Sequence, residues 1–316
     1  MNVIVVGVDL SPESLRAAEL AAHIAAATHA QLVPVHAVPA IPVFPEVVGI
    51  SPMPAFSPEL QNVVTSSSRA QVERELQRVL PAAAVRQLEV QVGPAPIIIA
   101  DVARRRRADL VVLGGKHHGA LARGLGRSTA HYLVRTLDMP VLVVAQSADH
   151  IRKVLAAVDI STVSSRMVEA AEQLASLLGA QLRLLHVVEP FRMTHLGPDQ
   201  WDEGAYYRSS QQSFDRFASP FKAIAKQDRV IRTGLAAEAI AEEAGAWQAD
   251  LVVVGSHGKG WVDRILIGST TQRLVTELPT SILVVPARSI RQQRVASKAP
   301  SRSRKRRTKR AAKGAA

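Results

Sequence analysis

The chain alternates between short runs of β-branched residues and longer alanine-rich stretches with helical periodicity. In the first half this pattern predicts strands at 3–8, 32–37, 88–92, 110–113 and 141–144, and helices at about 12–28, 60–79, 95–107 and 128–137. The second half follows the same order and ends with a strand at 282–285. Strands that are apolar on both faces and separated by helices indicate βαβ crossovers and a parallel sheet covered on both sides.

The two halves repeat one unit. Residues 3–9 parallel 154–159, and 32–38 parallel 182–188, at a constant offset. Further along, a smaller constant offset relates the two halves, which places a longer loop in the first half, within the proline-rich stretch 39–58. We therefore predict an α/β fold of two tandem, doubly wound, five-stranded parallel-sheet domains of Rossmann-like type, at 1–147 and 152–287. Ligands of such sheets bind beyond the carboxyl ends of the strands.

The positive charge is confined to the end of the chain. Of the 39 lysines and arginines, twelve lie from Arg288 onward, where there is no acidic residue, and the remaining 27 equal the 27 acidic residues. The segment 288–316 has almost no large apolar residue, so we expect a disordered polybasic tail. Such a tail can bind DNA or RNA through phosphates or anionic lipid head groups, or simply aid solubility.

Other features of composition narrow the class of protein. The chain has no cysteine, which excludes disulfides and thiolate metal sites. It begins with a strand-like run and not with a secretion signal, and prolines interrupt its longest apolar stretch, which excludes a membrane span there. We expect a cytoplasmic protein.

A glycine-rich segment follows the strand expected at 251–254. It reads G-x2-G-x9-G-S from Gly255 to Ser269 and then enters a helix. Glycines without a Cβ let backbone N–H groups approach an anion, and a helix N-terminus at Gly268 and Ser269 favours phosphate. The Ser269 hydroxyl is expected to cap this helix and to donate to the ligand. The spacing matches neither the Walker loop nor the Rossmann glycine motif.

With these features the chain resembles a tandem universal stress protein, with two UspA-like domains over about residues 1–287. The resemblance rests on the Gly-Ser-His-Gly start of the loop at 255, Val-Asp-x-Ser after the first strand of each half, the Leu-Leu-His-Val-Val strand at 184–188, and Ala-Asp-Leu-Val-Val before each glycine loop. It implies that the last strands of the two halves, 141–144 and 282–285, pack together as an intramolecular pseudo-dimer. It also implies that two chains can pair as a homodimer.

The resemblance also implies a ligand, ATP with Mg²⁺ or Mn²⁺ carried by the nucleotide. Phosphates and ribose would contact Gly255, Gly258, Gly268 and Ser269, with Thr270 close by. Asp159 would lie at the ribose and phosphate end of the first strand. The backbone of Val187 would bind adenine.

The first half departs from this pattern. Its aligned loop, 114–128, holds His117 and Arg127 where glycines are expected, and a Cβ at either place crowds a phosphate. We expect a degenerate site kept as scaffold, although the side chains of Lys116, Arg123 and Arg127 can pair with an anion. His117 and His118 are expected to be solvated and not to bind metal.

Two further pairs of residues match between the halves. Asp9 and Asp159 both suit a helix cap or a ligand contact, and we assign the cap to Asp9 and the ligand to Asp159. His36 and His186 are expected to be packed histidines whose ring nitrogens meet backbone groups.

No nucleophile elbow or paired acid and base is present in the sequence, so we assign no catalytic residue and expect at most weak ATP hydrolysis. The leading hypothesis is therefore an ATP-binding regulatory protein of the stress response. The alternatives are a nucleic-acid-associated protein that acts through its tail and a slow ATPase or adenylyl-transfer enzyme.

Overall fold

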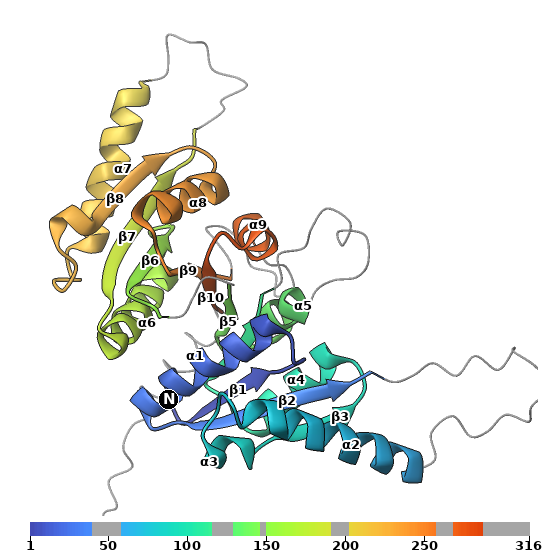
Figure 1. Cartoon of the computed structure of the whole chain (residues 1–316). Helices are drawn as coiled ribbons and strands as arrows, with labels where there is room; N and C mark the ends of the chain where they lie inside the picture. The colour runs from blue at the N-terminus through green and yellow to red at the C-terminus, as the bar shows by residue number, and fades with distance from the viewer. Residues whose placement is uncertain (40–57, 116–128, 146–149, 191–201, 257–267, 287–316) are drawn as a thin grey trace, which may run out of the picture.

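The computed structural model describes residues 1–39, 58–115, 129–145, 150–190, 202–256 and 268–286. Strands and helices alternate in both halves, as predicted (Figure 1). The first half contains β1 (Val3–Gly7), α1 (Pro12–Thr28), β2 (Gln31–Val38), α2 (Pro58–Leu76), α3 (Ala82–Val85), β3 (Glu89–Val92), α4 (Ala95–Arg105), β4 (Leu110–Gly114), α5 (Thr129–Thr136) and β5 (Val141–Val144).

The second half repeats this order, with a short 3-10 helix in place of α3. It contains β6 (Lys153–Val158), α6 (Thr162–Leu178), β7 (Gln181–Val188), α7 (Glu203–Ala218), η3 (Lys226–Asp228), β8 (Arg229–Thr233), α8 (Ala236–Trp247), β9 (Leu251–Gly255), α9 (Ser269–Glu277) and β10 (Ser281–Val285). The elements α3 and η3 were not predicted, because a single helical turn is too short to show a periodicity. Among the described residues, no helix is long and apolar enough to cross a membrane.

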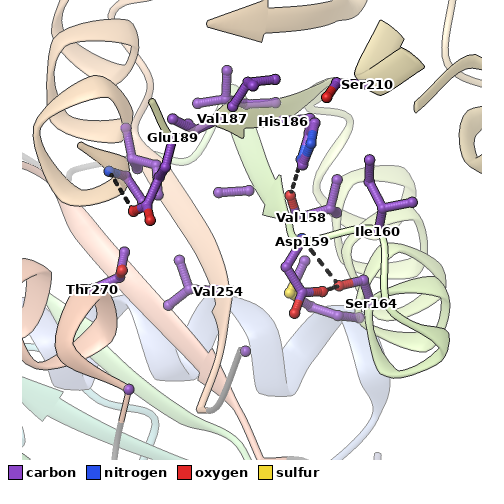
Figure 2. A pocket seen from close by; sticks show the side chains of 18 of the residues that line it. Val158, Asp159, Ile160, Ser164, His186, Val187, Glu189, Ser210, Val254 and Thr270 are labelled. Atoms are coloured by element: carbon purple, nitrogen blue, oxygen red, sulfur yellow. Dashed lines mark hydrogen bonds between the residues drawn. The ribbon is translucent and has the colours of Figure 1, made fainter. Parts of the chain in front are cut away.

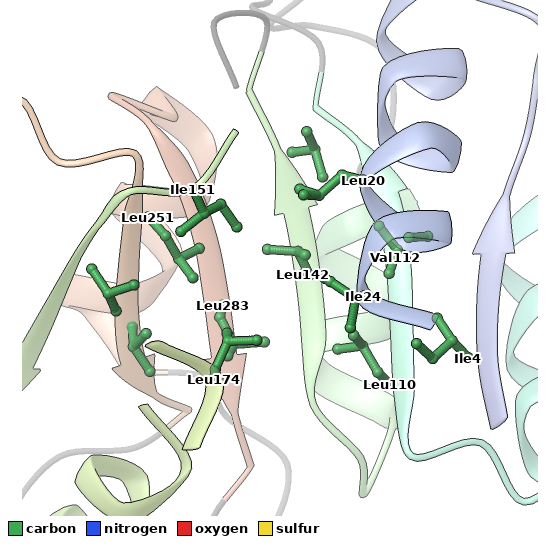
Figure 3. Packing of buried hydrophobic residues seen from close by; sticks show 14 of the residues in the cluster. Ile4, Leu20, Ile24, Leu110, Val112, Leu142, Ile151, Leu174, Leu251 and Leu283 are labelled. Atoms are coloured by element: carbon green, nitrogen blue, oxygen red, sulfur yellow. The ribbon is translucent and has the colours of Figure 1, made fainter. Parts of the chain in front are cut away.

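All the strands join one 10-stranded sheet in the order β3-β2-β1-β4-β5-β10-β9-β6-β7-β8. Neighbouring strands within each half are parallel, whereas β5 and β10 pair antiparallel, with Leu142 opposite Leu283. The two halves therefore meet through their last strands, at the contact that the family resemblance predicted. Figure 3 shows Leu142 and Leu283 on either side of this junction.

Helices cover both faces of the sheet. One apolar core lies under α1, α2, α3, α6 and α7, and the other lies under α4, α5, α8 and α9. Successive strand residues alternate between the cores, so that Ile4 and Val6 face the first and Val5 the second. This double burial explains why the strands are apolar without interruption.

The repeat extends to single hydrogen bonds at the amino edge of the sheet. Asp109 accepts from the backbone N–H groups of Asn2 and Val3. Asp250 accepts in the same way from Arg152 at 2.8 Å and Lys153 at 2.9 Å. Each aspartate thus ties the start of its half's first strand to the start of the fourth strand.

Candidate functional site

A cavity of about 560 Å³ lies at the carboxyl edge of the sheet in the second half. Its floor is the ends of β6, β7 and β9, and its walls come from α7 and from the N-terminal parts of α6, α8 and α9. Figure 2 shows Asp159 and His186 on one side of this space, and Glu189 and Thr270 on the other. The cavity lies where ligands of parallel α/β sheets bind.

Six of the seven predicted site residues line this one cavity. They are Asp159, Val187, Gly255, Gly268, Ser269 and Thr270. The seventh, Gly258, lies outside the described residues. Folding therefore brings together residues more than a hundred positions apart, while their contact with a nucleotide stays a prediction.

The N-terminus of α9 opens onto the cavity. Gly268 is the N-cap residue and, as a glycine, has no side chain with which to cap the helix. The predicted cap role of Ser269 is therefore wrong, because Ser269 is already the first helical residue. A hydrogen bond ties this helix to the end of β9, because Thr271 Oγ1 donates to the Gly255 carbonyl at 2.7 Å. The first N–H groups of a helix have no partner within it, so this end suits an anion.

Asp159 follows β6 directly and is held in a tight turn. Its Oδ1 accepts from the Ser161 N–H at 3.0 Å and from the Ser164 hydroxyl. Its Oδ2 is buried and has no hydrogen-bond partner among the described residues. The next residue, Ile160, has φ 62°, which is unfavourable for a β-branched side chain. Leu10 has the same conformation in the first half, with φ 64°, so the turn is common to both halves. The unpartnered buried oxygen costs free energy and is the feature that suggests a functional site.

The equivalent turn in the first half corrects one prediction. Asp9 accepts from the Ser11 N–H and from the Ser11 hydroxyl. The N-cap of α1 is Ser11, whose side chain accepts from the Ser14 N–H. The cap role assigned to Asp9 is wrong, because Asp9 folds the turn that presents Ser11 to the helix.

His186 lies in the wall of the cavity as a packed residue. Its Nδ1 is 2.8 Å from the Val158 carbonyl, and its ring stacks on Phe214 with centroids 5.7 Å apart. Because a carbonyl oxygen only accepts, Nδ1 must carry the proton. His36 makes the same contact with the Val8 carbonyl at 2.8 Å. The predicted packing of both histidines against backbone is confirmed.

At the corresponding edge of the first half, the backbone of α1 packs closely against the end of β4. A Cβ built on Gly114 would lie 2.6 Å from the carbonyl carbon of Glu13 and 2.6 Å from the Ser14 nitrogen. The start of α1 thus rests directly on the end of β4. The equivalent residues of the second half, Ser164 and Gly255, instead both line the cavity. The first-half loop from 116 to 128 lies outside the described residues, so the predictions for His117 and Arg127 stay predictions.

Several lining residues were not predicted. Hydroxyl groups line the cavity along one face of α7, at Tyr206, Ser209, Ser210 and Ser213. Their spacing of three and four residues is the available sequence signal. Glu189, directly after β7, was also missed.

The described lining carries negative charge. Asp159 and Glu189 contribute carboxylates, and no lysine or arginine is among the described lining residues. Across the described part of the chain, no group of three or more histidine, aspartate or glutamate residues is arranged to hold a metal ion.

Comparison with known proteins identifies the family. The model of the universal stress protein family matches residues 1–145 and again 150–286. A universal stress protein of Mycobacterium tuberculosis is 30% identical over 303 residues, which cover 89% of this chain and 96% of that protein. One from Thermus aquaticus is 31% identical over 135 residues, covering 42% of this chain and 98% of its own length.

A solved structure supports the fold. The crystal structure of a universal stress protein from Archaeoglobus fulgidus superposes with a TM-score of 0.64 at 17% identity, over 90% of this chain and 98% of that one. The chain therefore belongs to the universal stress protein family, whose domain it contains twice in tandem.

Proposed function

We propose that this protein is a nucleotide-binding regulator of the stress response, with ATP held in the cavity of the second half. The observation that carries the proposal is one cavity that contains a helix N-terminus with glycine, Gly268, as its N-cap residue and a buried carboxylate oxygen on Asp159 that has no partner among the described residues. The first feature suits a phosphate. The second suits a hydroxyl donor such as that of a ribose, because an ionised carboxylate only accepts.

The proposed ligand enters with its own divalent cation. Because the described lining is acidic, a free triphosphate would meet unfavourable charge there. A Mg²⁺ or Mn²⁺ ion on the phosphates lowers that charge, and Mg²⁺ commonly binds in this way, through phosphate oxygens and few protein ligands. Chain residues would then hold the nucleotide: α9 at the phosphates, Asp159 at the ribose and the Val187 backbone at the adenine. We assign no catalytic group, so ATP occupancy itself is the proposed signal.

Isothermal titration with ATP and Mg²⁺ tests the site. Gly268→Leu adds a side chain to a residue that lines the cavity, whereas Gly245→Leu adds the same side chain where a Cβ meets no atom within 4 Å. Loss of charge-assisted phosphate contacts predicts roughly tenfold or greater weakening for Gly268→Leu alone. Equal affinity in the two variants would contradict the proposal.

A second function concerns the segment 288–316, which lies outside the described residues. Its twelve basic and no acidic residues favour salt-dependent, sequence-independent binding to nucleic acid. A gel-shift titration against salt tests this with the full chain and with a chain ending at Ala287. We expect truncation to abolish the shift. A salt-dependent shift that survives truncation would refute the proposed role of the tail.

A further inference from the structure

Glu189 places a carboxylate in the cavity opposite Asp159. It follows the last residue of β7 and lines the cavity, and Figure 2 shows its carboxylate at the side of this space, beside the backbone nitrogen to which it is hydrogen-bonded. Its Oε1 accepts from the Ala236 N–H at 3.2 Å. Ala236 is the first residue of α8, whose N-cap residue, Leu235, provides no side-chain hydrogen bond. Glu189 therefore occupies a second helix N-terminus beside the cavity, and its negative charge disfavours a second anion there.

The fold does not require this carboxylate. β2 ends at Val38 as β7 ends at Val188, so the residue that corresponds to Glu189 is Pro39. The corresponding helix, α4, begins without a side-chain cap. The first half forms the same strand and helix without an acidic residue at this position. The role of Glu189 should therefore concern the ligand and not the fold.

The sheet order indicates which part of a nucleotide reaches Glu189. The strands β9, β6 and β7 are consecutive neighbours, and adjacent strands lie about 4.8 Å apart, so β7 ends on the order of 10 Å from β9. A nucleotide with its phosphates at α9, which follows β9, extends its base toward β7. Val187 and Glu189 lie on the same face of that chain segment because side chains alternate. The apolar side chains of Leu185 and Ile240 complete this end of the cavity.

We propose that Glu189 is a specificity-determining residue that selects a 6-aminopurine over a 6-oxopurine at the β7 end of the cavity. The inference rests on the proposed nucleotide function. An ionised carboxylate accepts hydrogen bonds and cannot donate. It therefore pairs with the exocyclic amino group of adenine and repels the carbonyl oxygen at the same position of hypoxanthine. Its charge also keeps the phosphates away from α8 and directs them to α9.

Titration calorimetry with ATP and with inosine triphosphate tests this choice, because the two ligands differ in the group at purine position 6. Glu189→Gln retains an oxygen that can accept from Ala236, so the start of α8 is preserved, while its amide also offers a donor. Glu238→Gln is the matched control. It removes the same charge from the first turn of α8, but Glu238 pairs with Arg273 at 2.9 Å and does not line the cavity.

We expect the wild type to bind ATP about tenfold or more tightly than inosine triphosphate, as for loss of a hydrogen bond to a charged group. Glu189→Gln should bring the ratio of the two dissociation constants close to one, and Glu238→Gln should leave it unchanged. The wild-type ratio needs no variant, so a folding defect cannot obscure it.

Three results would overturn the assignment of Glu189. They are a wild type that binds both ligands equally, an unchanged ratio in Glu189→Gln, and an equal loss in Glu238→Gln. In each of these cases ATP still binds, so the proposed nucleotide function stands. A wild type that binds neither ligand would overturn the nucleotide function and the role of Glu189 together.

Discussion

Replacement of Gly114 by alanine probes the close packing of the start of α1 against the end of β4 in the first half. The new Cβ would lie 2.6 Å from two backbone atoms of Glu13 and Ser14, and 2.8 Å from the Glu13 carbonyl oxygen. Carbon contacts are favourable at about 3.5–4.0 Å, so the first turn of α1 must move by about 1 Å. Because these atoms belong to backbone, no side-chain rotation relieves the contact.

The cost follows from this overlap. Overpacking a core typically lowers the free energy of unfolding by about 1–3 kcal/mol. Removal of a glycine offsets less than about 1 kcal/mol, by reducing the entropy of the unfolded chain. We therefore expect Gly114→Ala to destabilise the protein by about 1–3 kcal/mol. Gly245→Ala is the matched control, because its Cβ meets no atom within 4 Å and alanine favours the interior of α8 by about 0.5–1 kcal/mol.

Urea denaturation followed by two probes measures these effects. Circular dichroism reports on both halves, whereas tryptophan fluorescence reports on the second half, which holds all three tryptophans, Trp201, Trp247 and Trp261. The midpoint for Gly114→Ala should fall most clearly by circular dichroism, and that for Gly245→Ala should rise. A Gly114→Ala protein as stable as the wild type would refute the close contact between α1 and β4. Its ATP affinity should be unchanged, because the proposed site lies in the other half.

Three further predictions concern carboxylates outside the cavity. Burial, together with the charge of Glu169, raises the pKa of Glu172. Glu172→Gln should therefore stabilise the protein at pH 7, and this advantage should disappear as the pH falls through the raised pKa to the ordinary glutamate value of about 4.3. A difference in melting temperature that does not change with pH would contradict this. Burial acts to raise the pKa of Glu89, but hydrogen bonds from two arginines outweigh it, so the pKa is lowered. The ionised Glu89 should therefore contribute to the free energy of unfolding above about pH 4.3 and lose this contribution as the pH falls below that value. The stabilities of Glu89→Gln and the wild type should then converge in acid. The side chain of Glu243 is 2% exposed and pairs with Arg183 at 2.9 Å. Glu243→Ala should lower the free energy of unfolding, measured by urea denaturation, by about 3 kcal/mol, because it leaves a largely buried guanidinium without this partner. A decrease below about 1 kcal/mol would show that the pair contributes little.

Much of the architecture was accessible from local pattern. Uninterrupted apolar strands such as 251–254 can be buried only with helices on both sides of the sheet, and the two offsets between the halves reveal the repeat. The glycines near 255 and 268 predicted a phosphate site because their backbone can approach an anion. The family resemblance supplied the full set of seven site residues, and six of them line one cavity, since the carboxyl ends of parallel strands meet at one edge.

Where two neighbouring residues could both start a helix, the structure was needed to show which of them is the N-cap. Aspartate and serine both favour helix starts and turns, so the sequence did not show that Ser11 caps α1 while Asp9 folds the preceding turn. Likewise, serine at 269 and glycine at 268 are both acceptable N-caps, and only the backbone shows that Gly268 is the one used.

By itself the sequence determined the tandem α/β fold, the family and the edge of the sheet where a ligand belongs, because these depend on periodicity and on motifs that are local in the chain. Only the tertiary structure decided that β5 and β10 pair antiparallel and so form one continuous sheet, that α1 rests on Gly114 in the first half, and that Glu189 lies across the second-half cavity from Asp159. The distance between a helix end and a distant strand depends on packing, which no local stretch of sequence encodes.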